Sequence, residues 1–300
     1  MLRTFPLFLG VLVAFGNAVA QEATTSAPLM PQRDLQAVSL AGQTYQALVG
    51  LTPLQDISIQ ASAMHFAGSD EETGTATMQV RGGASRMVLS LSDGQRQEVF
   101  NSAQGVKGAW AGADGIWHPQ AIHNSWINEN WIFPAFALQA ALNDSTYSVV
   151  YQGLDKLDGA AVVHLTLYRI LPKQLQSANE LIKRLTTLDV YLDPASSLPV
   201  AIAFNIHPDD NAGLDIPVEI RYSDYKTISG VLVPTHVQKL VQGSVTLDLR
   251  VTGVAVNSGL AESVFAIPAT VAPVSPIAGP DESGPSESTY RTSPADGGAQ

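Results

Sequence analysis

Alternation of apolar and polar residues over successive short segments constrains the fold of this chain more than any other feature. In the last third of the chain it marks the segments 188–192, 200–206, 218–222 and 245–251. Because neighbouring side chains of a β-strand point to opposite faces, each segment predicts a strand with one apolar face. Earlier segments of the same kind lie at 57–60, 75–81, 87–91, 146–152 and 161–171. Together they predict an antiparallel sheet with one buried face.

Three segments show the helical spacing of apolar residues instead. Residues 34–51 predict an amphipathic helix that stops at Gly50, and residues 173–185 predict another, with Leu175 and Leu181 on its apolar face. Residues 121–142 predict two short helices broken near Pro134, because proline interrupts a helix interior. The predicted fold class is therefore mainly β (α+β).

The N-terminus has the pattern of a secretory signal peptide. Arg3 precedes an apolar run at 5–15, and Ala18-Val19-Ala20 offers the small residues that a signal peptidase requires. The run is too short to span a bilayer, which needs about 20 residues. We expect residues 1–20 to be removed, so that the mature chain begins at Gln21 and is exported to the periplasm. The alternative is an uncleaved anchor.

Composition separates one domain from two flanking segments. Residues 269–300 are rich in Pro, Ser, Gly and acidic residues, and residues 21–33 have a similar character. Such segments bury too little apolar surface to offset the entropy of ordering. The sequence predicts a flexible linker at 21–33, one folded domain at 34–268 and a disordered tail at 269–300.

Cysteine content and net charge exclude several classes of protein. The chain has no Cys, which removes disulfides, zinc–thiolate sites, thiol nucleophiles and the lipid attachment of a bacterial lipoprotein. We therefore expect a soluble protein rather than a membrane-anchored one. The net charge of −11 repels phosphate backbones, so nucleic-acid binding is not expected.

Three motifs resemble the outer-membrane lipoprotein-sorting family, the LolA-like proteins. They are LDVYLDPASSLPV at 188–200, YSDYKTISGVLVP at 222–234 and VAVNSGLAESVFAIP at 254–268. The resemblance covers about residues 34–268. It implies a curved antiparallel sheet that forms a half-open barrel, with helices covering the concave face. In that family the hollow holds the acyl chains of lipoproteins, and a basic residue gates it, for which Arg81 and Arg86 are candidates by position.

The half-barrel and the alternation together predict an apolar groove for acyl chains or lipidated proteins. Alternate strand residues should line the concave face, and the aromatic helices should lie across it. The expected groove residues are Met78, Val80, Met87, Leu89, Trp126, Trp131, Phe136, Val190, Phe204, Ile220, Leu247 and Leu249. Trp110 and Trp117 belong to the same aromatic-rich stretch. These aromatics could line a ligand cavity or simply pack as core, and both readings can hold for one cluster.

Motifs for catalysis, metals and cofactors are missing. No G-x-S-x-G serine context and no phosphate-binding G-x-x-x-x-G-K-[ST] loop occurs. His118 and His123 are five residues apart, a spacing that fits neither one helical face nor strand alternation. We therefore predict no catalytic residues, no metal site and no cofactor. A hydrolase with a dispersed site remains an alternative.

The leading hypothesis is a periplasmic lipid- or lipoprotein-binding carrier of the bacterial envelope, without enzymatic activity. The alternative is an envelope assembly or stress-sensing factor that binds protein partners through the sheet. A deep apolar hollow would favour the first hypothesis, and a filled one the second.

Overall fold

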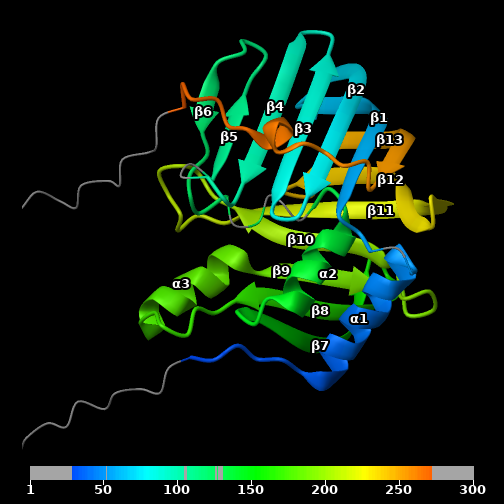
Figure 1. Cartoon of the computed structure of the whole chain (residues 1–300), viewed down its shortest axis with the longest axis vertical. Coiled ribbons are helices and arrows are strands. Elements are labelled where there is room, and N and C mark those ends of the chain that lie inside the picture. The colour runs from blue at the N-terminus through cyan, green and yellow to red at the C-terminus, as the bar shows by residue number, and fades with distance from the viewer. Residues whose placement is uncertain (1–28, 52, 105–106, 126, 128–130, 272–300) are drawn as a thin grey trace, which may run out of the picture.

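The computed structural model describes residues 29–271, except 52, 105–106, 126 and 128–130. Within these residues thirteen strands form one antiparallel sheet, in the order β6-β5-β4-β3-β2-β1-β13-β12-β11-β10-β9-β8-β7 (Figure 1). The first six strands are β1 (Asp56–Ala67), β2 (Asp70–Arg81), β3 (Ala84–Leu91), β4 (Gly94–Asn101), β5 (Gly108–Ala111) and β6 (Trp117–Pro119). The others are β7 (Tyr147–Leu157), β8 (Ala160–Arg169), β9 (Leu188–Leu192), β10 (Pro199–Ile206), β11 (Ile216–Ile228), β12 (Val231–Val241) and β13 (Ser244–Val256).

The strand order shows that the curved sheet stays open, because its two outer strands do not pair with each other. The strands form two meanders, β1–β6 and β7–β13, which are joined where β1 pairs with β13. β6 and β7 follow one another in the chain, yet they are the two outer strands of the sheet. The described residues of the segment between them, 120–125, 127 and 131–146, therefore belong to a connection between the two open edges of the sheet. The predicted half-open barrel is confirmed.

Two of the three described helices cover the hollow. α1 (Leu35–Val49) and α2 (Pro134–Asn143) pack against each other and against β7, and α1 also contacts β12. Ala37, Ala41 and Leu48 of α1 join the same buried cluster as the inward residues of the sheet. α3 (Gln176–Thr186) lies apart from this cluster and packs on β8, with Lys183 Nζ 4.8 Å from the centroid of the Tyr168 ring.

The structure corrects two details of the helix predictions. Pro134 begins α2 instead of separating two helices, because a proline at the first helical position loses no helical hydrogen bond. The described residues before it form turns and bends. α3 begins at Gln176 rather than at residue 173, and Leu175 and Leu181 are exposed. Its buried face includes Asn179, whose side chain exchanges hydrogen bonds of 2.8 and 3.0 Å with the backbone of Leu171.

The folded domain is longer at both ends than the predicted 34–268. Arg33, which was assigned to a flexible linker, forms a parallel bridge with Val149. Its guanidinium also donates to the carbonyls of Ala141 and Tyr147 at 2.9 and 3.0 Å. At the other end Val271 is buried against Val99 and Ala109, so the disordered tail cannot begin at 269. The predicted signal peptide, and residues 272–300 of the predicted tail, lie outside the described residues.

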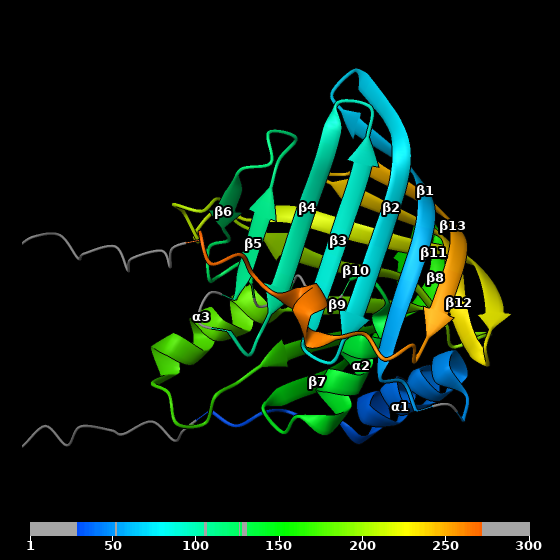
Figure 2. The ribbon, with the colours of Figure 1, turned by 45° about the horizontal axis from the view of Figure 1, so that its top comes forward.

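The segment 257–271 crosses the outer surface of β1–β4 as a strap (Figure 2). It is held at several points along its length. Arg81 donates to the carbonyl of Leu260 at 2.7 Å, Arg86 donates to that of Val264 at 3.1 Å, and Phe265 is buried. Both arginines therefore face the convex side of the sheet. The family resemblance implied that one of them gates the hollow, and this expectation is wrong because neither side chain faces the hollow.

None of the helices in the described part of the chain is long and apolar enough to cross a membrane.

Candidate ligand-binding site

The predicted groove residues gather in one place. Eleven of the twelve belong to a single buried cluster, and none of these is more than 6% exposed. Trp126 lies outside the described residues. The alternation therefore identified the inward face of the sheet, although most of that face is covered. Ligand binding by these residues stays a prediction.

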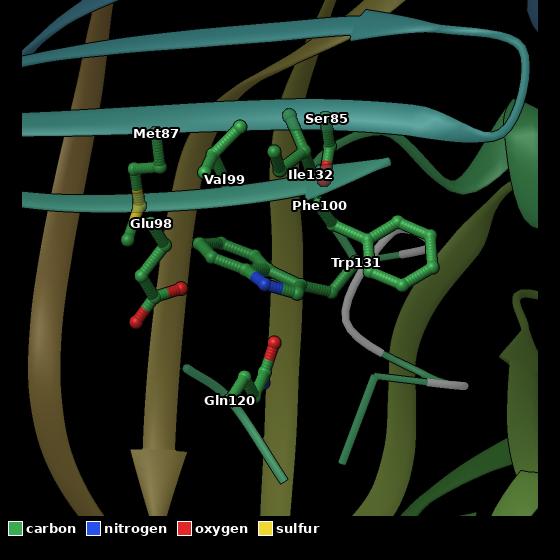
Figure 3. A pocket seen from close by; sticks show the side chains of 8 residues that line it. All are labelled: Ser85, Met87, Glu98, Val99, Phe100, Gln120, Trp131 and Ile132. Carbon is green, nitrogen blue, oxygen red and sulfur yellow. The ribbon is translucent and has the colours of Figure 1, made fainter. Parts of the chain in front are cut away.

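Trp131 fills the middle of the hollow. Figure 3 shows its ring surrounded by side chains of β3, β4 and the segment after β6, among them Met87, Glu98 and Gln120. A cavity of about 10 Å³ remains beside it, which is room for one water molecule at most. The Tyr222 hydroxyl donates to the Trp131 carbonyl at 2.6 Å, and burial raises the pKa of this hydroxyl well above its usual value. These contacts hold Trp131 in place, so that its side chain closes this part of the hollow.

An open cavity of about 300 Å³ lies at one end of the hollow, which we call the mouth. It lies near the β1–β2 turn, at the end of these strands away from α1 and α2 (Figure 2). Met87, Leu89 and Leu247 give it an apolar floor that continues into the buried cluster. The remaining lining residues are His65, Arg96, Gln97, Glu98, Trp110, Ala111, Gly112, Lys239 and Thr246. Of the predicted groove residues that the structure describes, only these three floor residues line the mouth cavity.

Arg96 is neutralised by two carboxylates at the rim of the mouth. Its guanidinium donates to both carboxylate oxygens of Glu72 at 3.2 Å, and to those of Asp93 at 3.1 and 2.7 Å. The hydrogen bond with Glu72 raises the pKa of Arg96, and the same contact lowers the pKa of Glu72. Arg96 and Glu72 are therefore ionised near neutral pH, and the hydrogen bonds hold all three side chains in place.

Lys239 and Glu98 are different, because no partner in the described chain neutralises either of them. Lys239 Nζ lies 5.2 Å from the centroid of the Trp131 ring, and neither residue forms an ion pair with another described residue. Glu98 pairs in register with Trp110 on β5, and inward-facing Trp110 is 40% exposed. Two opposite charges and an accessible aromatic ring thus line one cavity with an apolar floor.

His65 completes the mouth as a neutral group. Its Nδ1 atom is buried and has no hydrogen-bond partner among the described residues. Burial lowers the pKa of the imidazole, and the positive charge of Arg96 lowers it further. The ring is therefore uncharged at neutral pH and adds a polar surface without adding charge.

Sequence reasoning missed the charged residues of the mouth. Arg96 and Glu98 alternate with outward residues along β4, in register with Leu89 and Met87, so they face the hollow. Charges at inward positions of a strand could have indicated a site, because such charges are costly to bury without partners. The groove was predicted from apolar residues alone, and apolar residues line the covered part of the hollow as well as the open part.

The structure also contains a serine–histidine–aspartate chain that no sequence motif announces. Ser223 Oγ lies 3.1 Å from His236 Nδ1, and His236 Nε2 lies 3.0 Å from Asp248 Oδ2. Gln238 donates to the same carboxylate oxygen at 2.7 Å. The residues come from β11, β12 and β13 and face the convex side, so they do not line the mouth.

The histidines that were considered as metal ligands are used otherwise. His118 stacks on Trp110 with ring centroids 4.5 Å apart, and His123 Nε2 lies 3.1 Å from the carbonyl oxygen of Pro208. Among the described residues no group of three or more His, Asp or Glu side chains is arranged to hold a metal ion.

Comparisons with known proteins concern the fold. No family model matches the chain, and no curated protein matches it in sequence. The structure is similar to a LolA superfamily protein from Nitrosomonas europaea, with 11% identity and a TM-score of 0.47 over 77% of this chain and 97% of that one. A DUF1329 family protein from Desulfovibrio piger has 11% identity and a TM-score of 0.46, over 77% and 96% of the two chains. The half-open barrel predicted from the sequence is present.

Proposed function

We propose that this protein is an exported, non-enzymatic binding protein of the bacterial envelope, which carries an amphiphilic lipid or a lipidated protein. The observation that carries the proposal is the mouth cavity of about 300 Å³, which opens where the helices leave the hollow uncovered. Its volume is at the lower end of ligand pockets, which measure roughly 300–1,000 Å³. The N-terminal signal pattern supports a periplasmic location.

The energetics of the mouth favour a partly inserted acyl chain. Each buried methylene contributes about 0.8 kcal/mol, whereas micromolar affinity corresponds to about 8 kcal/mol. About five methylenes on the floor would therefore supply roughly half of that free energy, and headgroup contacts would have to supply the rest. A longer insertion would have to displace Trp131, which is buried and anchored by Tyr222. The mouth therefore suits reversible binding, as a carrier requires.

The test is the binding of a fluorescent fatty-acyl probe to the wild-type protein and to variants of the floor. Leu89→Glu places a charge on the floor and should weaken binding at least tenfold, because the carboxylate resists desolvation by the chain. Leu89→Trp, which adds bulk without charge, should weaken binding by filling the cavity. Leu154→Glu is the matched control, because Leu154 is 73% exposed on β7, away from the mouth. Absence of probe binding to the wild-type protein would overturn the proposal.

The covered part of the hollow favours a second candidate. Because Trp131, α1 and α2 fill most of the predicted groove, an envelope assembly or stress-sensing factor that binds proteins also fits the structure. The edge strand β6, and the part of β7 beyond its bridge with Arg33, would offer backbone hydrogen bonds to such a partner. Absence of binding of every acyl probe to the wild-type protein would support this candidate.

A further inference from the structure

The two unpaired charges of the mouth are the starting point. Lys239 on β12 and Glu98 on β4 line the same cavity, but they form no ion pair with each other. An ion that is partly removed from water without a partner costs free energy, so such ions in a cavity indicate groups that a ligand complements. Because the two charges are opposite, one ligand with a single charge would satisfy only one of them.

The other charged groups near the mouth do not change this balance. Arg96 is matched by Glu72 and Asp93, whose carboxylates contact it directly. His65 is neutral at neutral pH because burial lowers its pKa. The groups left for a ligand are therefore one ammonium, one carboxylate and the partly exposed ring of Trp110, one side of which stacks on His118.

The two aromatic rings indicate which charged group of a ligand each side of the cavity would bind. Trp110 is the register partner of Glu98, so a carboxylate and an aromatic face lie together on the β4–β5 side. This combination binds ammonium groups, through charge attraction and through the cation–π interaction. On the β12 side, Lys239 Nζ lies over the Trp131 ring, which positions the ammonium without neutralising it. A compact ammonium of this kind binds phosphate oxygens.

We propose that the ligand of the mouth is an amphiphile with a zwitterionic headgroup, in which a phosphate contacts Lys239 and an amine or quaternary ammonium contacts Glu98 and Trp110. The apolar chain would then lie on the floor formed by Met87, Leu89 and Leu247. This inference rests on the proposed function and specifies the chemical class of its ligand. A lysophospholipid with a phosphocholine or phosphoethanolamine head has this chemistry.

Four single-chain probes that share one acyl chain test the assignment. Their headgroups are phosphocholine, a phosphate monoester, trimethylammonium and an uncharged sugar. We expect phosphocholine to bind at least tenfold more tightly than the uncharged probe, with the phosphate and trimethylammonium probes, which each carry charge of one sign, between them. Equal affinity for all four, or strongest binding of a probe with charge of only one sign, would overturn the zwitterion assignment and leave the proposed function intact. Failure of every probe to bind would overturn both.

Variants then assign each charge to its side of the headgroup. Lys239→Met should remove most of the advantage conferred by phosphate and leave the trimethylammonium probe bound as before or better. Glu98→Gln should do the reverse, and Trp110→Leu should weaken only the probes that carry an ammonium. Lys226→Met and Glu71→Gln are matched controls, because both residues are exposed and neither lines the mouth. A Lys239→Met variant that loses affinity equally for all four probes would contradict the assignment.

Discussion

The two ends of the hollow differ in the residues that occupy the inward-facing positions of the sheet. At the end covered by α1 and α2, inward positions such as Ile57 and Val80 are apolar and fully buried. At the mouth, inward positions of the neighbouring strands hold His65, Arg96 and Glu98. The inward charges lie in the part of the hollow that the helices leave uncovered, because a charged side chain beneath a helix would lose its contact with water. The inward charges therefore mark the part of the hollow that is open to a ligand.

The largest expected effect comes from shortening an aromatic side chain at each end. Phe133 is fully buried and packs against Phe136 with ring centroids 6.3 Å apart. Phe133→Ala should lower the free energy of unfolding by about 3–5 kcal/mol, because it leaves a cavity in the covered core. Trp110→Ala at the mouth should cost about 1 kcal/mol or less, as expected of an exposed side chain. Urea unfolding of both variants measures this difference. Similar losses in the free energy of unfolding would show that the two ends of the hollow do not differ in packing.

A smaller effect is expected from the carboxylate at the covered end. Asp56, which is 3% exposed, accepts hydrogen bonds from the backbone N–H groups of Ser258, Gly259 and Leu260 at 2.8, 3.0 and 3.4 Å. It thereby ties the strap to the start of β1. Asp56→Ala should lower the free energy of unfolding by about 1–3 kcal/mol, because the strap loses its hydrogen bonds to a buried, charged acceptor. Hydrogen exchange of residues 258–260 should become faster, and unchanged exchange would show that the strap is held by other contacts.

The smallest effect concerns pH and the histidine of the mouth. The folded-state pKa of His65 is lowered by burial, so the unfolded chain takes up a proton at a higher pH than the folded chain. The stabilisation from keeping His65 neutral is therefore complete above the unfolded pKa of about 6.5 and is lost as the pH falls below it. We expect His65→Gln to lose less stability than the wild-type protein between pH 7 and pH 5. Equal losses in urea unfolding would contradict this role.

His207 provides an internal comparison for that experiment. Its side chain lies outside the mouth, it is also buried, and its pKa is lowered by burial despite a 3.0 Å contact with Asp215. His207→Gln should likewise reduce the loss of stability on acidification. Unlike His65→Gln, it should not alter the binding of a mouth ligand.

The sequence predicted the strands and their inward face because alternation depends only on neighbouring residues. Met78 and Met87, for example, face each other across β2 and β3 as the pattern required. It did not predict which part of that face would stay open, because this depends on how residues 120–143 cross the hollow. The position of Trp131 results from distant contacts, such as the hydrogen bond from Tyr222.

The ends of the domain were misplaced for a related reason. Arg33 and Val271 lie in segments whose composition is typical of flexible chain, and each is fixed by contacts with residues distant in sequence. Composition averages over a segment, so it misses a single residue that packs into the domain. The serine–histidine–aspartate chain on the convex face was likewise invisible to motif searches, because its residues come from three different strands.

The most direct test of the central claim is to map where an amphiphile binds. A lysophospholipid with a photoreactive group in its acyl chain can be cross-linked to the wild-type protein, and the labelled peptides identified by mass spectrometry. We expect labelling at β3 and at the start of β13, where Met87, Leu89 and Leu247 form the floor of the mouth. Labelling confined to β7–β9 or to the convex face, or no saturable labelling at all, would contradict it.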